Sequence, residues 1–80
     1  MRDNAIVVHA FWDEEAGVWV ATSDDVPGLV TEAETQDELL AKLHVLIPEL
    51  IELNGDGFDG LPEVPLVVMS EQTSKVRIKA

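Results

Sequence analysis

Two stretches rich in β-branched and aromatic residues stand close together near the start of the chain, AIVVHAFW at residues 5–12 and VWVATS at residues 18–23. Residues of these types are favoured in strands. The short polar connection between them, DEEAG, contains Gly17, which can take the positive φ that a hairpin loop needs near its end. The sequence therefore predicts a β-hairpin, and the rest of the chain must fit against the sheet that it starts.

The register of this hairpin decides which side chains share a face of the sheet. If Trp12 faces Val18, alternation along the strands gives two faces that are both largely apolar. We expect one face to contain Ile6, Val8, Ala10, Val18 and Val20, and the other to contain Val7, His9, Phe11, Trp19 and Ala21. A one-residue bulge would reverse half of this assignment.

The segment Val26-Pro27-Gly28-Leu29 has the composition of a type II turn. Proline fixes the first central φ, and glycine accepts the positive second one. Such a turn does not match the twist of a tight hairpin, so the connection to the third strand should be wide. We expect that strand at residues 29–32 or slightly longer.

A helix should follow, because Thr35 is a good N-cap and Glu38 stands three residues later to complete a capping box. Negative charge at the start of a helix also suits the helix dipole. Asn54 and Gly55 provide the stop. The apolar residues at helical spacing, which should cover one sheet face, are Leu39, Leu43, Leu46, Ile47 and Leu50, with Leu53 as a further candidate.

Proline at position 48 interrupts this helical pattern, so we expect a kink near His44 or a second short helix that starts at Pro48. Residues 55–65 are a loop by their glycine and proline content. The run LVVM at residues 66–69 has no polar alternation, which is typical of a strand in the interior of a sheet. The tail after it contains a short alternating run around Val76 and Ile78, which could be a frayed end, an edge strand or a strand lent to another subunit.

Size and charge limit the possible functions. Eighty residues make one domain, residues 1–80, with a core at 5–69 and a tail at 70–80. The chain has no cysteine to stabilise so small a fold, and apolar residues on both sheet faces predict a homo-oligomer, a dimer or larger. The formal net charge of -11 disfavours direct binding to DNA or to a membrane surface. Without a leader or a membrane-spanning run, we expect a cytoplasmic protein.

The sequence offers no catalytic, cofactor or metal site, and we expect a protein that is not an enzyme. A two-metal nuclease site needs converging carboxylates, and neither residues 5–12 nor residues 66–69 contain one. The acids of the hairpin loop are typical of a solvated turn. His9 and His44 stand alone on different elements, which is a weak metal signal. Residues 56–59 lack the ligand spacing of a calcium loop, so a plain turn is the simpler interpretation.

The chain resembles the HicB-like antitoxin domain in three short segments, DDVPGL, VTEAET and QDELL. It also resembles that domain in the expected order of elements, which is strand, strand, Pro-Gly turn, strand, capped helix and strand. The similarity covers residues 5–53 and is greatest to a small group of uncharacterised HicB-like domains with nearly the same words. It implies an α+β fold, the partial ribonuclease H fold β-β-β-α-β, with a fourth strand parallel to the first and an extra C-terminal strand as an option. Asp25 takes the acidic position that the family has before its Pro-Gly, and Glu34 stands where the family usually has aspartate. Fuller members carry a DNA-binding segment that is not recognisable after Met69.

The resemblance implies an antitoxin that neutralises a small basic ribonuclease toxin by occlusion. Charge complementarity would steer that encounter. The alternative is an orphan HicB-like module, a homo-oligomeric binding or regulatory protein without a toxin. The candidate partner-binding residues are Phe11, Trp19, Asp24, Asp25, Glu32 and Glu34, and the candidate oligomer interface consists of His9, Phe11, Trp19, Val76 and Ile78.

Overall fold

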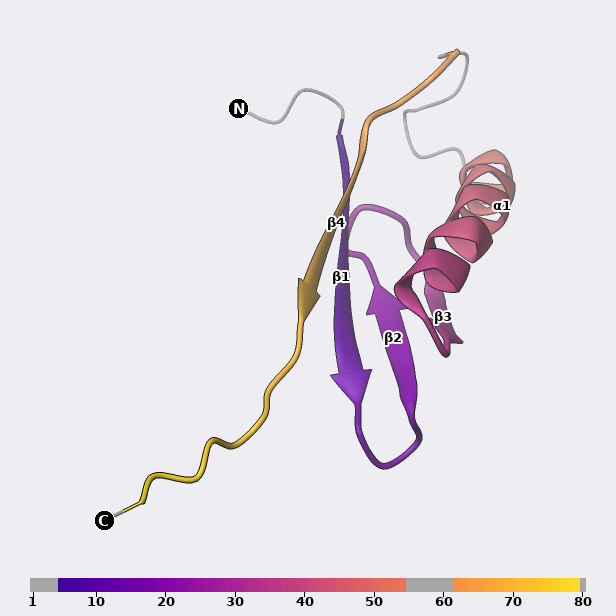
Figure 1. Ribbon diagram of the computed structural model, residues 1–80. Helices are drawn as coiled ribbons and strands as arrows, with labels where there is room; N and C mark the ends of the chain where they lie inside the picture. Colours follow the sequence, from indigo (N-terminus) through magenta and orange to yellow (C-terminus); the bar gives the residue numbers. More distant parts are fainter. Residues whose placement is uncertain (1–4, 55–61, 80) are drawn as a thin grey trace.

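A computed structural model describes residues 5–54 and 62–79 of the protein. Its elements are, in chain order, β1 (Ile6–Asp13), β2 (Val18–Thr22), β3 (Val30–Ala33), α1 (Gln36–Asn54) and β4 (Leu66–Glu71). The strands form one sheet in the order β3-β2-β1-β4, and α1 covers one of its faces (Figure 1). The β1/β2 and β2/β3 pairs are antiparallel, whereas β1 and β4 are parallel. The protein is therefore α+β with the predicted element order.

The β1–β2 hairpin differs from the predicted register by one residue. Gly17 has a φ of 70°, and its N–H donates to the Asp13 carbonyl at 2.8 Å, which closes the turn. Asp13 is consequently the last residue of β1 to be paired, and it faces Val18, so that Trp12 faces Trp19. The predicted pairing of Trp12 with Val18 is wrong, and the face assignment of β2 is reversed.

The Pro27-Gly28 turn forms as the sequence predicts. Gly28 has a φ of 86°, and the N–H of Leu29 donates to the carbonyl of Val26 at 3.1 Å. The two residues that flank the turn, Val26 and Leu29, are both buried in the core. The turn thus fixes how this connection folds back over the sheet, and the prediction is confirmed.

Thr35 caps the start of α1. Its Oγ1 accepts a hydrogen bond from the N–H of Glu38 at 3.1 Å and donates to Oε1 of Glu38 at 3.3 Å. The predicted N-cap is confirmed, although Glu38 accepts from the hydroxyl of Thr35 and not from its backbone N–H. The side chains that α1 buries are Leu39, Leu43 and Ile47, whereas Leu53 is 80% exposed and does not belong to the covering face.

Pro48 does not divide the helix, because α1 continues through it as one element. The prediction of a second short helix at Pro48 is wrong. Pro48 has no N–H for the carbonyl of His44. Both residues are exposed, so water can reach this carbonyl on the outer side of the helix.

β4 is an edge strand, not the interior strand that its apolar run predicts. It extends to Glu71, two residues beyond the predicted end. Its side chains alternate between the helix side, where Leu66 and Val68 are half-buried, and the opposite side, where Val67 and Met69 are exposed. Both sides of β4 are therefore apolar, although none of the described strands lies along its outer edge.

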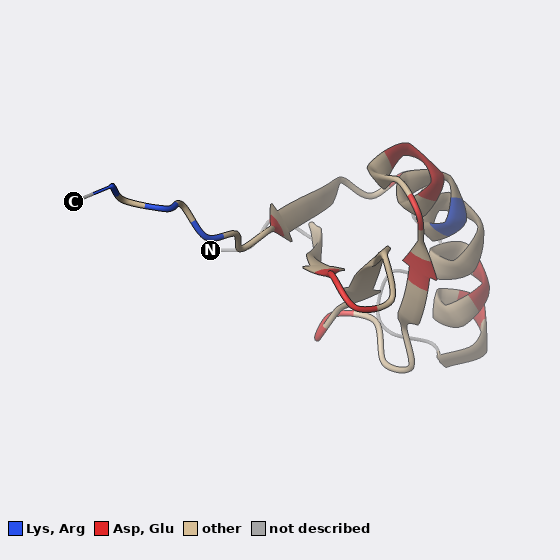
Figure 2. Ribbon diagram, turned by 60° about the horizontal axis from the view of Figure 1, so that its bottom comes forward, with Lys and Arg blue, Asp and Glu red and all other residues tan. Residues whose placement is uncertain are grey.

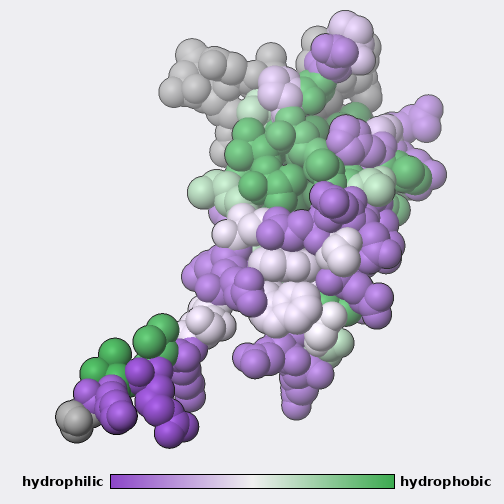
Figure 3. Space-filling view, in the orientation of Figure 1, coloured by the Kyte–Doolittle hydropathy of each residue, from purple (hydrophilic) through white to green (hydrophobic). Residues whose placement is uncertain are grey.

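The core lies between α1 and the sheet. Its buried members come from all of the first three strands, from the Pro27-Gly28 connection and from the helix: Ile6, Val8, Ala10, Trp19, Ala21, Val26, Leu29, Ala33, Leu39, Leu43 and Ile47. Figure 3 shows that apolar surface also gathers between α1 and the β1/β4 side of the sheet. Of the predicted loop, residues 55–61 lie outside the described part, including the candidate calcium segment at 56–59. Within the described residues, no helix is both long and apolar enough to cross a membrane.

Candidate protein-binding face

The sheet face that points away from α1, here called the open face, is largely apolar. Since side chains alternate along a strand, the pairing registers determine which residues share this face. No described helix or strand covers it (Figure 1). Its apolar residues are Val7, Phe11, Val18, Val20, Val30, Val67 and Met69.

One lateral row of side chains crosses the whole open face. Phe11 on β1 pairs with Val20 on β2 and with Glu71 on β4, and Val20 pairs in turn with Glu32 on β3. The row therefore has two apolar side chains in its middle and a carboxylate at each edge of the sheet. Phe11 is 46% exposed although it belongs to an inner strand.

A second row lies beside it. His9 pairs with Met69 on one side and with Thr22 on the other, and Thr22 pairs with Val30. Met69 is 55% exposed and Val30 is 70% exposed. Among the described residues, no lysine or arginine belongs to the strands that make this face. An apolar centre with an acidic rim is the arrangement expected of a surface that binds a basic protein.

Trp19 does not belong to the open face. It is buried in the core, where its ring meets that of Trp12 edge to face, with 5.4 Å between the ring centroids. Its predicted role in partner binding and in an oligomer interface is wrong. The cause is the hairpin register, since the pairing of Trp12 with Trp19 places both rings on the helix side.

Asp25 has a structural role. Its Oδ2 accepts a hydrogen bond from the N–H of Val7 at 2.8 Å, and the neighbouring Ser23 hydroxyl donates to the carbonyl of Val7 at 2.6 Å. The N–H of Asp25 also donates to Oγ of Ser23 at 3.1 Å. These side chains satisfy the backbone of β1 at a point beyond the end of β2. We therefore remove Asp25 from the candidate binding residues and keep the exposed Asp24.

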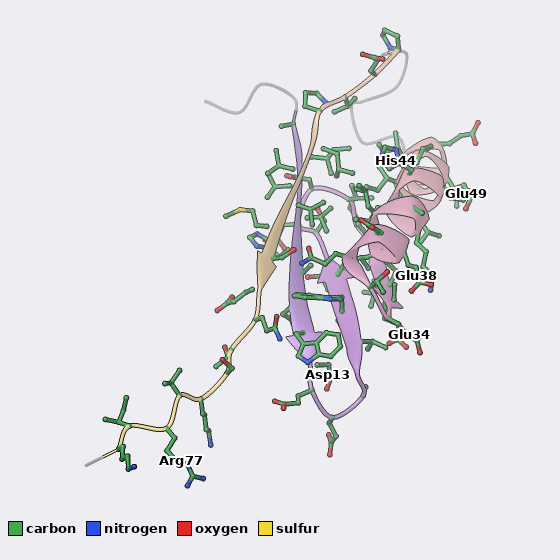
Figure 4. The ribbon with its side chains drawn as sticks, viewed as in Figure 1. Asp13, Glu34, Glu38, His44, Glu49 and Arg77 are labelled. Atoms are coloured by element: carbon green, nitrogen blue, oxygen red, sulfur yellow. The ribbon has the colours of Figure 1, made fainter. Side chains whose placement is uncertain are left out.

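The remaining candidate residues lie in different places. His9, Phe11 and Glu32 share the open face. Glu34 is exposed and lies just before the start of α1 (Figure 4). The tail residues Val76 and Ile78 lie beyond the end of β4 and are exposed. Sequence reasoning missed Val67 and Met69; the signal was the unbroken apolar run LVVM, which places apolar side chains on both sides of β4.

The described residues give little support for a catalytic or metal centre. His9 is on the open face, whereas His44 is exposed on α1, on the other side of the sheet (Figure 4). No three histidine or acidic side chains gather into a metal-binding group within the described part of the chain. An open hollow of about 710 Å³ at the root of the tail is lined by two carboxylates, those of Glu14 and Glu71, together with Trp12, Thr73, Ser74 and Lys75.

Comparison with known proteins places the chain in a family. A family model described as a domain of unknown function, DUF1902, matches residues 5–80. The chain belongs to the DUF1902 family. None of the curated proteins matches this DUF1902 protein. It is similar to the crystal structure of a hypothetical protein from the extremely thermophilic bacterium Thermus thermophilus, with 53% sequence identity over 92% of this chain and 99% of that chain, and a TM-score of 0.68.

Proposed function

We propose that this DUF1902 protein is a HicB-like antitoxin that binds a small basic ribonuclease toxin through its open face. By covering the toxin, it would prevent the toxin from reaching RNA, and it would do so in the cytoplasm. The observation that carries the proposal is the row Glu32–Val20–Phe11–Glu71, an apolar pair between two carboxylates. Such a row can bury an aromatic anchor in a partner while its ends meet basic side chains.

The charge of the chain supports a basic partner. A formal net charge of -11 on an 80-residue protein speeds encounter with a positively charged protein and opposes contact with RNA itself. A toxin that binds RNA must present basic surface to the phosphates. An acidic protein can therefore compete for that surface by occupying it.

The fold is compatible with the proposal. The helix between β3 and β4 returns the chain so that β4 runs parallel to β1, which is the arrangement of the partial ribonuclease H fold that the HicB-like resemblance implies. We propose this finer fold assignment together with the function. The words DDVPGL and QDELL that carry the resemblance coincide with the Pro27-Gly28 connection and with the first turns of α1.

The test begins with the genes beside this one, among which the proposal expects one that encodes a small basic protein. RNA cleavage by that protein is measured with and without the purified DUF1902 protein, and binding is measured by titration calorimetry. We expect stoichiometric inhibition of cleavage. A neighbouring gene that encodes no such protein, or cleavage that continues at saturating concentrations, would reject the antitoxin function.

A pair of variants locates the binding surface. Phe11→Ser removes the aromatic side chain from the open face and should weaken toxin binding at least tenfold, about 1.4 kcal/mol. Val45→Ser is the matched control, because Val45 is 60% exposed on α1, away from the open face. Equal affinities of the two variants would show that the toxin binds elsewhere.

A second candidate function is an orphan homo-oligomeric binding or regulatory module without a toxin. The observation that favours it is the pair of exposed apolar side chains on the tail, Val76 and Ile78, which self-association would cover. The same cleavage and calorimetry experiments separate the two candidates, because the orphan module would neither bind the neighbouring basic protein nor inhibit it.

A further inference from the structure

The C-terminal tail, residues 72–79, leaves the body of the molecule after β4 (Figure 1). The chain measures 58 × 28 × 18 Å along its principal axes, with a radius of gyration of 15.1 Å. A compact chain of this length would have a radius of gyration of about 12 Å. In the tail, Val76 is 80% exposed and Ile78 is 82% exposed. Two large apolar side chains thus stand in solvent on a segment that is already extended.

β4 offers an edge to which such a segment can pair. Among the described residues, no hydrogen bond reaches the backbone of β4 on the side away from β1. The other edge of the sheet is protected, because Nζ of Lys42 donates to the carbonyl of Glu32 on β3 at 2.6 Å. An unprotected edge with apolar residues on both sides is a template for another strand. The interior pattern of LVVM would be explained if a further strand lay beside β4.

The alternation of side chains predicts how the tail would pair. Continued from β4 into the tail, the alternation assigns the residues to two sides. The helix side holds Leu66, Val68, Val76 and Ile78, and the open-face side holds Val67, Met69, Lys75 and Arg77.

Residues that lie opposite each other in an antiparallel pair share a face. In the register centred on Gln72, two copies of the segment 66–78 pair with each other, and Val68 of each copy faces Val76 of the other. Leu66 then faces Ile78 in the same way. Each of the four apolar residues on the helix side thus faces an apolar residue of the other copy. In the dimer these pairs would extend the apolar surface that lies beside α1 (Figure 3).

Charge also favours a second copy as the occupant of this edge. Residues 72–80 contain three of the five basic residues and none of the sixteen acidic ones, which leaves sixteen acidic residues against two basic ones in the rest of the chain. Figure 2 shows this separation of a basic tail from an acidic body. When the tail of one copy lies along β4 of another, its Lys75 comes within diagonal reach of Glu71 of that copy. The placement of each basic tail on the acidic body of the other copy thereby lessens the repulsion between the two bodies.

We propose that the protein forms a two-fold symmetric dimer in which each tail adds as an antiparallel strand to the free edge of β4 of the second copy. The two sheets become one continuous sheet, and both edges at the centre are paired. This inference does not depend on toxin binding, because it uses the edge of β4 and the tail, and it shares only Glu71 with the row around Phe11 on which the proposed toxin surface rests.

The oligomeric state of matched variants tests the proposal. Sedimentation equilibrium should find a dimer of the native protein at micromolar concentration. Val76→Ser with Ile78→Ser keeps the length and charge of the tail, and it should raise the dimer dissociation constant at least about tenfold. Val45→Ser with Leu53→Ser is the control, because these helix residues are 60% and 80% exposed and lie outside the proposed interface. A circular dichroism spectrum of each variant checks that the variant is folded.

A cross-linking experiment tests the register. The chain has no cysteine, so a single introduced thiol reports on its own position. At the centre of an antiparallel pair, opposite Cα atoms lie about 4.5–5.5 Å apart, which suits a disulfide. Gln72→Cys should therefore cross-link under mild oxidation much faster than Glu52→Cys on the exposed side of α1. A native protein that sediments as a monomer, a dimer unaffected by the tail variant, or equal cross-linking of the two thiols would each overturn the proposal.

Discussion

At the scale of single residues, side chains from the segment that follows β2 make the hydrogen bonds to β1 that the backbone of a paired strand would otherwise make. Beyond Thr22 the backbone of β2 no longer pairs with β1, yet the N–H and the carbonyl of Val7 still need partners. The hydroxyl of Ser23 and the carboxylate of Asp25 supply them. This arrangement holds the start of the Pro27-Gly28 connection against β1, and it explains an acidic residue that otherwise suggests a binding role.

Asp25→Ala should reduce the free energy of unfolding by about 1–2 kcal/mol, because it leaves the half-buried N–H of Val7 without its acceptor. Asp24→Ala is the matched control, since Asp24 is exposed, and its effect should stay within about 0.5 kcal/mol. Urea denaturation of the two variants measures the difference. Equal losses would contradict the structural role of Asp25.

Gly28→Val should destabilise the protein by at least about 1 kcal/mol. The cause is the φ of 86°, not a clash, because an added Cβ would meet only Cδ2 of Leu50 at an ordinary 3.9 Å. Gly28→Asn should cost less, since asparagine tolerates a positive φ better than a β-branched residue does. Thermal denaturation gives the order of the three proteins, and a valine variant as stable as the asparagine variant would argue against backbone strain.

At the scale of elements, α1 tolerates a proline that the sequence marks as a break. Leu39, Leu43 and Ile47 hold the helix against the sheet on one side, while Pro48 lies on the exposed side. Most of the stability of a helix in a protein comes from such packing and not from intrinsic propensity. The buried side therefore keeps the helix continuous although a hydrogen bond is missing on the outer side.

Pro48→Ala should raise the free energy of unfolding by about 1–3 kcal/mol. Alanine restores the N–H for the carbonyl of His44 and removes a residue that costs about 3 kcal/mol in a helix interior. Glu49→Ala, at the next exposed position, should change the stability by less than about 0.5 kcal/mol. A decrease in the melting temperature of Pro48→Ala would show that the helix is bent at this point and that the proline fits the bend.

At the scale of the whole molecule, one helix covers one face of a four-stranded sheet, and no described helix or strand covers the other face or the free edge of β4. The molecule thus has two adjoining surfaces with different chemistry, which meet at β4. The open face is apolar with an acidic rim, whereas the edge of β4 and the tail combine apolar residues with basic ones. The two proposed contacts meet at β4, because Glu71 belongs to the acidic rim of the open face and lies within diagonal reach of Lys75 of the second copy in the proposed dimer.

The protein should not cleave RNA or an RNA–DNA hybrid in the presence of Mg²⁺ or Mn²⁺. A two-metal site needs carboxylates that converge. The acids on β1 and β4, Asp13 and Glu71, stand at the strand ends, and no metal-binding group of three forms among the described residues. The measurement is a cleavage assay with a ribonuclease H as positive control. Activity that disappears on substitution of an acidic residue would contradict this prediction.

The sequence by itself determined the features that depend on neighbouring residues. Pro27 and Gly28 specify their turn because one residue fixes its φ and the other accepts a positive φ. Thr35 specifies the start of α1 because its hydroxyl reaches an N–H only three residues away. The order of strands and helix also follows from local patterns of apolar residues. In each case the deciding interaction spans a few residues.

Only the tertiary structure decided the features that depend on distant segments. The closing hydrogen bond from Gly17 to Asp13 shifts the hairpin by one residue and thereby moves Trp19 from the open face into the core. The role of Asp25 depends on Val7, which is eighteen positions earlier in the chain. The apolar run of β4 does not predict whether β4 is an edge strand or an interior strand, because the neighbours of a strand depend on how the whole sheet is assembled. A period of two fixes alternation along each strand, but the register between strands fixes which side of the molecule each residue faces.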